Sequence, residues 1–167
     1  MLADQFTEIF REEHRKIRDT LLELIDAFSV RDLQRARTLL QRTAQYAGPH
    51  FRYEEETLYP ALVQIFGEKY VEYLFSEHDR AIGRAGKLVE LASKTILSNA
   101  DVKQAVELIR AILPHVSDCD GLSIMVERLP EQTVQGVLDA RERSNRSGLD
   151  LMQWTQQVRK RPIQAVA

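Results

Sequence analysis

Cysteine, proline and glycine are scarce in this chain of 167 residues, which contains one, five and seven of them respectively. A single cysteine excludes an internal disulfide framework and is typical of the reducing cytoplasm, where we expect the protein to reside. The low glycine and proline content, with few clusters of β-branched residues, argues against a strand-rich fold. The composition therefore favours a helical protein.

Further absences narrow the classes of function. The sequence has no apolar run of about 20 residues that could cross a membrane, and its acidic start, MLADQFTEIFREEH, is not a signal peptide. The net charge of −2 implies no general attraction to nucleic acid or to an anionic membrane. We also find no glycine-rich nucleotide-binding loop and no Ser-His-Asp arrangement. What the length does allow is one domain with a well-filled core.

Apolar residues recur in steps of three and four, which predicts helices over about 4–28, 31–66, 68–96 and 101–128. Gly48-Pro49 predicts a kink or a break inside the second segment, and Gly67, a turn at 97–101 and Pro130 separate the others. We predict an all-α fold: an antiparallel up-down-up-down four-helix bundle over 1–130 and a helical extension over 131–167. The extension is the candidate surface for a homodimer or another protein partner. Its basic tail, 159–162, is expected to be mobile.

The chain has only four histidines, and each falls on the apolar stripe of a different helical stretch: His14, His50, His78 and His115. Counting residues to the intervening turns, at about 1.5 Å per residue, places them at one depth to within roughly 9 Å. A single buried histidine is most often a hydrogen-bonded core residue. Four in one layer instead indicate a metal site, since helical bundles hold pairs of iron ions with converging imidazoles and carboxylates.

Glu54 follows His50 by four residues and therefore lies on the same helix face, which Leu58, Ala61 and Ile65 extend. A carboxylate on a buried face is costly unless it is paired or bound to a metal. Glu54 is therefore a candidate ligand. The alternative is that it lies at the helix edge, in water.

Several of these residues carry a family resemblance. The sequence Glu13-His14, the stretch 50–60 (His-x-x-x-Glu-Glu-x-x-Leu-Tyr-Pro), Glu77-His78 and His115 together resemble the hemerythrin-like (HHE cation-binding) family over roughly residues 4–130. The resemblance implies a four-helix bundle that holds two iron ions, oxo- or hydroxo-bridged. The ligands that it implies are His14, His50, Glu54, His78, His115 and Asp120, with the two carboxylates as bridges.

The same resemblance implies binding of dioxygen or nitric oxide, by a sensor, a carrier or a redox or stress-response protein. One alternative is a diiron enzyme that acts on peroxide or nitric oxide. A second alternative, from another class, is a helical interaction protein that binds zinc or no metal.

The fourth helix departs from the family pattern. Where a second His-x-x-x-Glu motif is usual, Cys119 stands four residues after His115 and Asp120 stands five after it. The oxygen carriers of the family use the five-residue spacing, yet in a regular α-helix it points the acid some 140° away from the histidine. We expect Asp120 to be the ligand, reached through a π-turn eased by Gly121. Cys119 is the competing ligand, although a free cysteine usually behaves as a small buried hydrophobe.

The third helix lacks a second histidine that the oxygen carriers have four residues from the first. Leu74 and Ile82 occupy the two corresponding positions. The iron ion there either keeps an open position or borrows an oxygen donor. Tyr46, one turn before His50, is the local candidate for that donor, with core packing as its alternative role. An open position favours reactivity over simple storage of oxygen.

Overall fold

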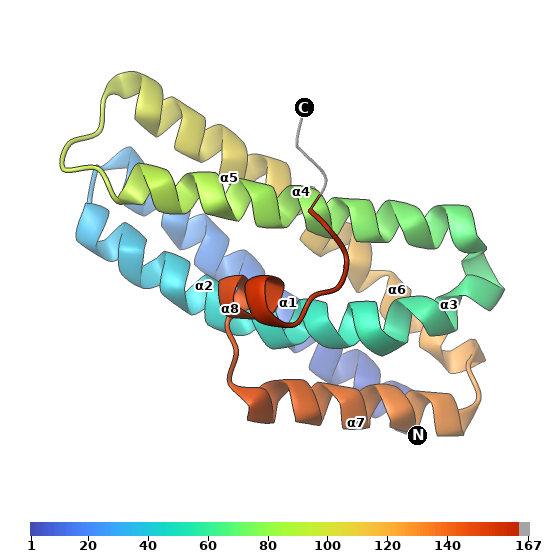
Figure 1. Ribbon diagram of the computed structural model, residues 1–167. Coiled ribbons are helices and arrows are strands. Elements are labelled where there is room, and N and C mark those ends of the chain that lie inside the picture. The colour runs from blue at the N-terminus through green and yellow to red at the C-terminus, as the bar shows by residue number, and fades with distance from the viewer. Residues whose placement is uncertain (164–167) are drawn as a thin grey trace.

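The computed structural model describes residues 1–163, and within this range the chain forms helices and turns but no strand. Four long helices lie side by side (Figure 1): α1 (Leu2–Ser29), α2 (Leu33–Tyr53), α4 (Glu68–Ala92) and α5 (Asn99–Asp120). α1 packs against α2 and α5, and α4 packs against the same two helices, so that the four enclose one interior. The prediction of an all-helical protein is confirmed.

Shorter elements complete the chain. A π-helix at Glu54–Leu58 and α3 (Tyr59–Phe66) continue α2, while α6 (Leu122–Met125) and a 3-10 turn at Val126–Arg128 follow α5. α7 (Glu131–Ser147) packs along α1 and α2, and α8 (Leu151–Gln157) packs on α2 (Figure 1). Residues 164–167 of the predicted extension lie outside the described residues. Among the helices of 1–163, none combines the length and the apolar character that a membrane crossing requires.

The break that is one of the two outcomes predicted at Gly48-Pro49 is absent, because α2 runs through Pro49 to Tyr53. Proline disfavours a helical conformation of the preceding residue partly through a clash with that residue's Cβ, and glycine has none. Gly48 has a second role. A Cβ there would lie 2.5–2.6 Å from backbone atoms of residues 149–151, so only glycine lets the chain before α8 rest on α2.

The basic tail, 159–162, contributes two arginines to ion pairs with the bundle. The side chain of Arg159 is 1% exposed and forms ion pairs with Glu55 and Asp79. Arg161 pairs with Asp79 and Glu72. The sequence shows these cations but not their carboxylate partners, which lie at least 80 residues earlier in the chain.

The buried apolar side chains form two clusters, separated by a polar layer. One, here called the Phe6 cluster, contains Phe6 and Phe10 of α1, and the other, the Leu24 cluster, contains Leu24 and Ile17 of the same helix. His14 lies between Phe10 and Ile17 along α1. The same order recurs in α4 as Leu74, His78 and Ile82. The layer between the clusters is where the histidines of the four long helices lie.

Candidate metal centre

The four imidazoles that the sequence spacing places at one depth lie close together, and all four are buried. His14 Nε2 is 2.9 Å from His50 Nε2. The ring centroids of His78 and His115 are 5.0 Å apart. Each ring comes from a different long helix. The layer therefore brings together imidazole rings from α1, α2, α4 and α5.

Glu54 enters this layer from the first position of the π-helix. It is fully buried, with Oε1 3.4 Å from His50 Nε2 and Oε2 3.1 Å from His78 Nε2. These contacts are ion pairs, and neither oxygen meets the full geometric criteria for a hydrogen bond. The alternative that Glu54 lies at a helix edge in water is therefore wrong. Its carboxylate spans the layer, with a different histidine at each oxygen.

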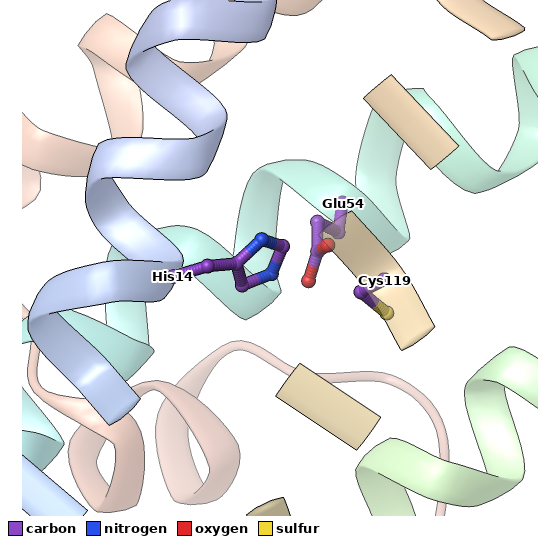
Figure 2. Close-up of side chains that lie close together, drawn as sticks. All are labelled: His14, Glu54 and Cys119. Atoms are coloured by element: carbon purple, nitrogen blue, oxygen red, sulfur yellow. The ribbon is translucent and has the colours of Figure 1, made fainter. Parts of the chain in front are cut away.

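Cys119 and Tyr59 also face the layer. Figure 2 shows the Glu54 carboxylate between the His14 ring and the Cys119 thiol, and one ligand atom from each of these residues lies within 4.8 Å of the others. The Tyr59 hydroxyl is 3.0 Å from His78 Nε2 and 3.7 Å from Cys119 Sγ. Burial raises the pKa of both the thiol and the phenol well above their usual values. Without a cation beside them, both groups keep their protons.

Asp120 lies outside the layer. The predicted π-turn after His115 is absent, because α5 is α-helical through Asp120 and Gly121 keeps a right-handed helical φ of −65°. The one π-helix within residues 1–163 is at Glu54–Leu58 instead. In the regular helix the carboxylate turns away from His115, and Asp120 Oδ1 lies 3.1 Å from Nδ1 of His14, the nitrogen that faces away from the layer.

Tyr46 is not brought to the layer either. Tyr46 is 39% exposed. Ala47, the next residue of α2, is buried and occupies the inward position at that level. The oxygen donor that the structure places near His78 is Tyr59 rather than Tyr46.

Three of the four imidazoles have a carboxylate at Nδ1. The distances are 3.1 Å from His14 to Asp120, 2.8 Å from His50 to Glu13 and 2.9 Å from His78 to Glu55. A carboxylate can only accept, so each ring donates its Nδ1–H and turns Nε2 into the layer. Metal-binding histidines are oriented in this way. Sequence reasoning missed the roles of Glu13 and Glu55, although both stand in the motif stretches.

The charges in the layer follow from burial and from these contacts. Burial lowers the pKa of His14 to about 4 and that of His115 to about 3, which keeps both rings neutral at pH 7. Burial also opposes a charge on His50, but Glu54 and Glu13 outweigh it and raise the His50 pKa to about 10. Burial disfavours the Glu54 anion too, yet His50 and His78 hold the pKa of its carboxyl well below its usual range. An ionised carboxylate among imidazoles is a set of metal ligands, and a bound cation would displace the proton from His50.

Tyr59 would not face the layer if the helix after His50 were a regular α-helix. Nine residues after His50 amount to about 900°, which is half a turn away from it. The π-helix accommodates one extra residue, so Tyr59 turns toward the layer. The inward face beyond it shifts as well. Leu58 is buried as predicted, but Leu62 is buried in place of Ala61 and Ile65.

Comparison with known proteins identifies one family. The family model of the hemerythrin HHE cation binding domain matches residues 5–122, which is more than half of the chain. No curated protein and no solved structure matches the chain. The matched range contains the four histidines, Glu54, Tyr59 and Cys119. The chain thus belongs to the hemerythrin HHE cation-binding family.

Proposed function

We propose that the protein is a non-haem diiron protein that binds dioxygen or nitric oxide. The observation that carries the proposal is the Glu54 carboxylate, which is fully buried and has no hydrogen-bond partner at either oxygen. The charge of this carboxylate needs a compensating cation, which is the His50 imidazolium in the metal-free protein and would be a metal ion when one displaces that proton. Its oxygens lie beside Nε2 of His50 and Nε2 of His78, so two cations, one at each oxygen, fit this arrangement.

The remaining donors divide between the two oxygens of Glu54. We assign His14 and His50 to one iron ion, because their Nε2 atoms are 2.9 Å apart beside Oε1. We assign His78 and His115 to the other. Tyr59 and Cys119 lie on this second side and are candidates for the position that the missing third-helix histidine leaves open.

Asp120 is assigned to Nδ1 of His14, in place of the bridging role that the resemblance implies. When bound, an iron pair supplies electrons and an open coordination position for a diatomic ligand.

A cavity beside the layer supports a small uncharged ligand. It has a volume of about 60 Å³, and His14, His50 and His115 form its polar side. Most of the other side chains that line it are apolar, among them Ile17 of α1 and Met152 of α8. Apolar cavities hold water poorly because they offer few hydrogen-bond partners. Dioxygen and nitric oxide need few such partners, so they suit this cavity better than a charged substrate does.

We also propose a helix topology and a cellular compartment for the protein. The contacts among α1, α2, α4 and α5 support an antiparallel up-down-up-down four-helix bundle over 1–130, with 131–167 as its extension. The single buried, free cysteine is consistent with a reducing cytoplasm.

Metal analysis and gas binding test the proposal. The wild-type protein, loaded with iron(II) under argon, should hold two iron ions per chain and change its near-ultraviolet spectrum on exposure to dioxygen or nitric oxide. Glu54→Ala should hold well below two. Glu56→Ala is the matched control, because Glu56 lies in the same π-helix but is exposed and pairs with Arg52. Full iron content and an unchanged spectrum in Glu54→Ala would contradict the proposal. Steady-state assays with peroxide and nitric oxide would reveal the enzyme alternative.

A zinc site is the second candidate, and the thiol in the layer favours it. Cys119 Sγ lies within 4.8 Å of ligand atoms of His14 and Glu54. Thiolate and imidazole together suit zinc well, whereas oxygen donors suit ferric iron. Zinc in place of iron in protein purified from its own host would support this candidate.

A further inference from the structure

Two arginines from the segment after residue 130 contact carboxylates that lie behind the histidine layer. The first is Arg141 of α7, whose Nε donates to Glu13 Oε1 at 2.6 Å. The other oxygen of Glu13 lies 2.8 Å from His50 Nδ1 and accepts a further hydrogen bond from Tyr53, also at 2.8 Å. A continuous chain of contacts therefore runs from α7 through Glu13 to a histidine of the layer.

The second arginine repeats this arrangement at Glu55, in the π-helix. Arg159 donates through Nε and Nη2 to the two oxygens of Glu55, at 3.0 and 2.7 Å. Glu55 Oε1 is also 2.9 Å from His78 Nδ1. The Arg159 side chain is 1% exposed and that of Glu55 is 7% exposed, so the contacts are shielded from water. A two-point contact between guanidinium and carboxylate fixes the plane of the carboxylate as well as its position.

We propose that residues 131–163 act as a positioning element of the metal centre, in which Arg141 and Arg159 hold Glu13 and Glu55 so that His50 and His78 present Nε2 to the layer. The inference rests on the proposed metal-binding function. A carboxylate behind a metal-binding histidine sets the orientation of the ring, and its loss costs about 10- to 100-fold in metal affinity. An arginine that fixes such a carboxylate affects the metal through it, without contacting the metal.

Neighbouring arginines provide matched controls, because the carboxylates that they contact form no hydrogen bond with a histidine. Arg161 belongs to the same segment as Arg159 and pairs with Asp79 and Glu72. Arg146 belongs to α7, as Arg141 does, and pairs with Glu142 on the surface. Replacement of either control removes the same charge from the same element.

The test measures the affinity of the full chain for cobalt(II), by competition with a chromogenic chelator, together with the visible spectrum of the bound cobalt. Arg159→Gln and Arg141→Gln should each weaken binding by about 10- to 100-fold and alter the spectrum. Arg161→Gln and Arg146→Gln should bind within about twofold of wild type, since neither arginine touches Glu13 or Glu55. Arg159→Lys keeps the charge but loses the two-point contact, and it should lie between wild type and Arg159→Gln. It also serves as the second variant if Arg159→Gln does not fold.

A double variant separates positioning from a general effect on stability. If Arg159 acts through Glu55, the variant Glu55→Gln/Arg159→Gln should bind cobalt no more weakly than Glu55→Gln alone. Losses that add, or wild-type affinity and spectrum in Arg159→Gln, would overturn the inference.

The diiron proposal fails in wild-type protein, by an iron content below two or by a lack of gas binding, whereas the positioning inference is tested by the ratio of the cobalt affinity of the variant to that of wild type. A wild-type chain that binds no cobalt would overturn the inference as well.

Discussion

Gly48 is the contact point between α2 and the chain that leads into α8, so its replacement tests how the extension is held. In Gly48→Ala, the new Cβ would lie 2.5 Å from the carbonyl carbon of Asp150 and 2.6 Å from backbone atoms of Leu149 and Leu151. Backbone atoms cannot rotate away as a side chain can. Ordinary contact begins near 3.4 Å, so the segment must move by about 0.9 Å, the difference from 2.5 Å.

The movement carries buried side chains with it. Leu151 and Trp154 are 5% and 1% exposed, and both belong to the Leu24 cluster, so a shift of α8 disturbs their packing. Overpacking of this kind costs up to about 3 kcal/mol. The higher helix propensity of alanine offsets about 1 kcal/mol of that. The net loss of up to about 2 kcal/mol should lower the Tm of a chain of this size by up to roughly 8 °C.

Gly136→Ala is the matched control, because a Cβ at Gly136 of α7 would have no heavy atom within 4 Å. Helix propensity alone should make this variant more stable by about 1 kcal/mol. Thermal unfolding of both metal-free variants, followed by far-ultraviolet circular dichroism, compares the two substitutions. The same rise in Tm for both would refute the reasoning, since it would mean that residues 149–151 do not rest on Gly48.

Three further predictions concern the residues in and around the histidine layer. Cys119→Ser should change the visible spectrum of the iron-loaded protein, while Asp120→Asn should retain both iron ions. An unchanged spectrum in Cys119→Ser together with a loss of iron in Asp120→Asn would instead identify Asp120 as the ligand. Tyr59→Phe should remove any tyrosinate-to-iron absorption band and cost at most about 3 kcal/mol in urea unfolding, because the contacts of the hydroxyl with His78 Nε2 and Cys119 Sγ are both lost. The metal-free protein should lose stability as the pH falls from 6.5 toward 4, because His14 and His115, with pKa values of about 4 and about 3 against 6.5 when unfolded, stay neutral only in the folded state. Urea unfolding at several pH values checks this slope.

The features that sequence could predict are those that repeat locally. The apolar stripes of α1, α4 and α5 follow helical periodicity over many residues, and four histidines at matching distances from the turns predict a common layer. Glu54 follows from its four-residue spacing to His50.

The features that sequence could not predict depend on a single irregular turn or on distant partners. Tyr59 faces the layer only because a π-helix shifts the face of α3 by one residue. Arg159 meets Glu55 across 104 residues of sequence. Neither contact produces a periodic pattern of residues in the sequence.

The polar layer also has a consequence for how the protein unfolds. Because the layer contributes imidazoles and a carboxylate rather than apolar area, the Phe6 and Leu24 clusters are two hydrophobic cores that share helices but not a continuous apolar contact. Each core can then open as its own cooperative unit. The coupling between the two cores depends on the interactions among the four histidines. A metal at the layer would convert two weakly coupled halves into one folding unit. Hydrogen exchange would register this as equal protection at both ends of α1.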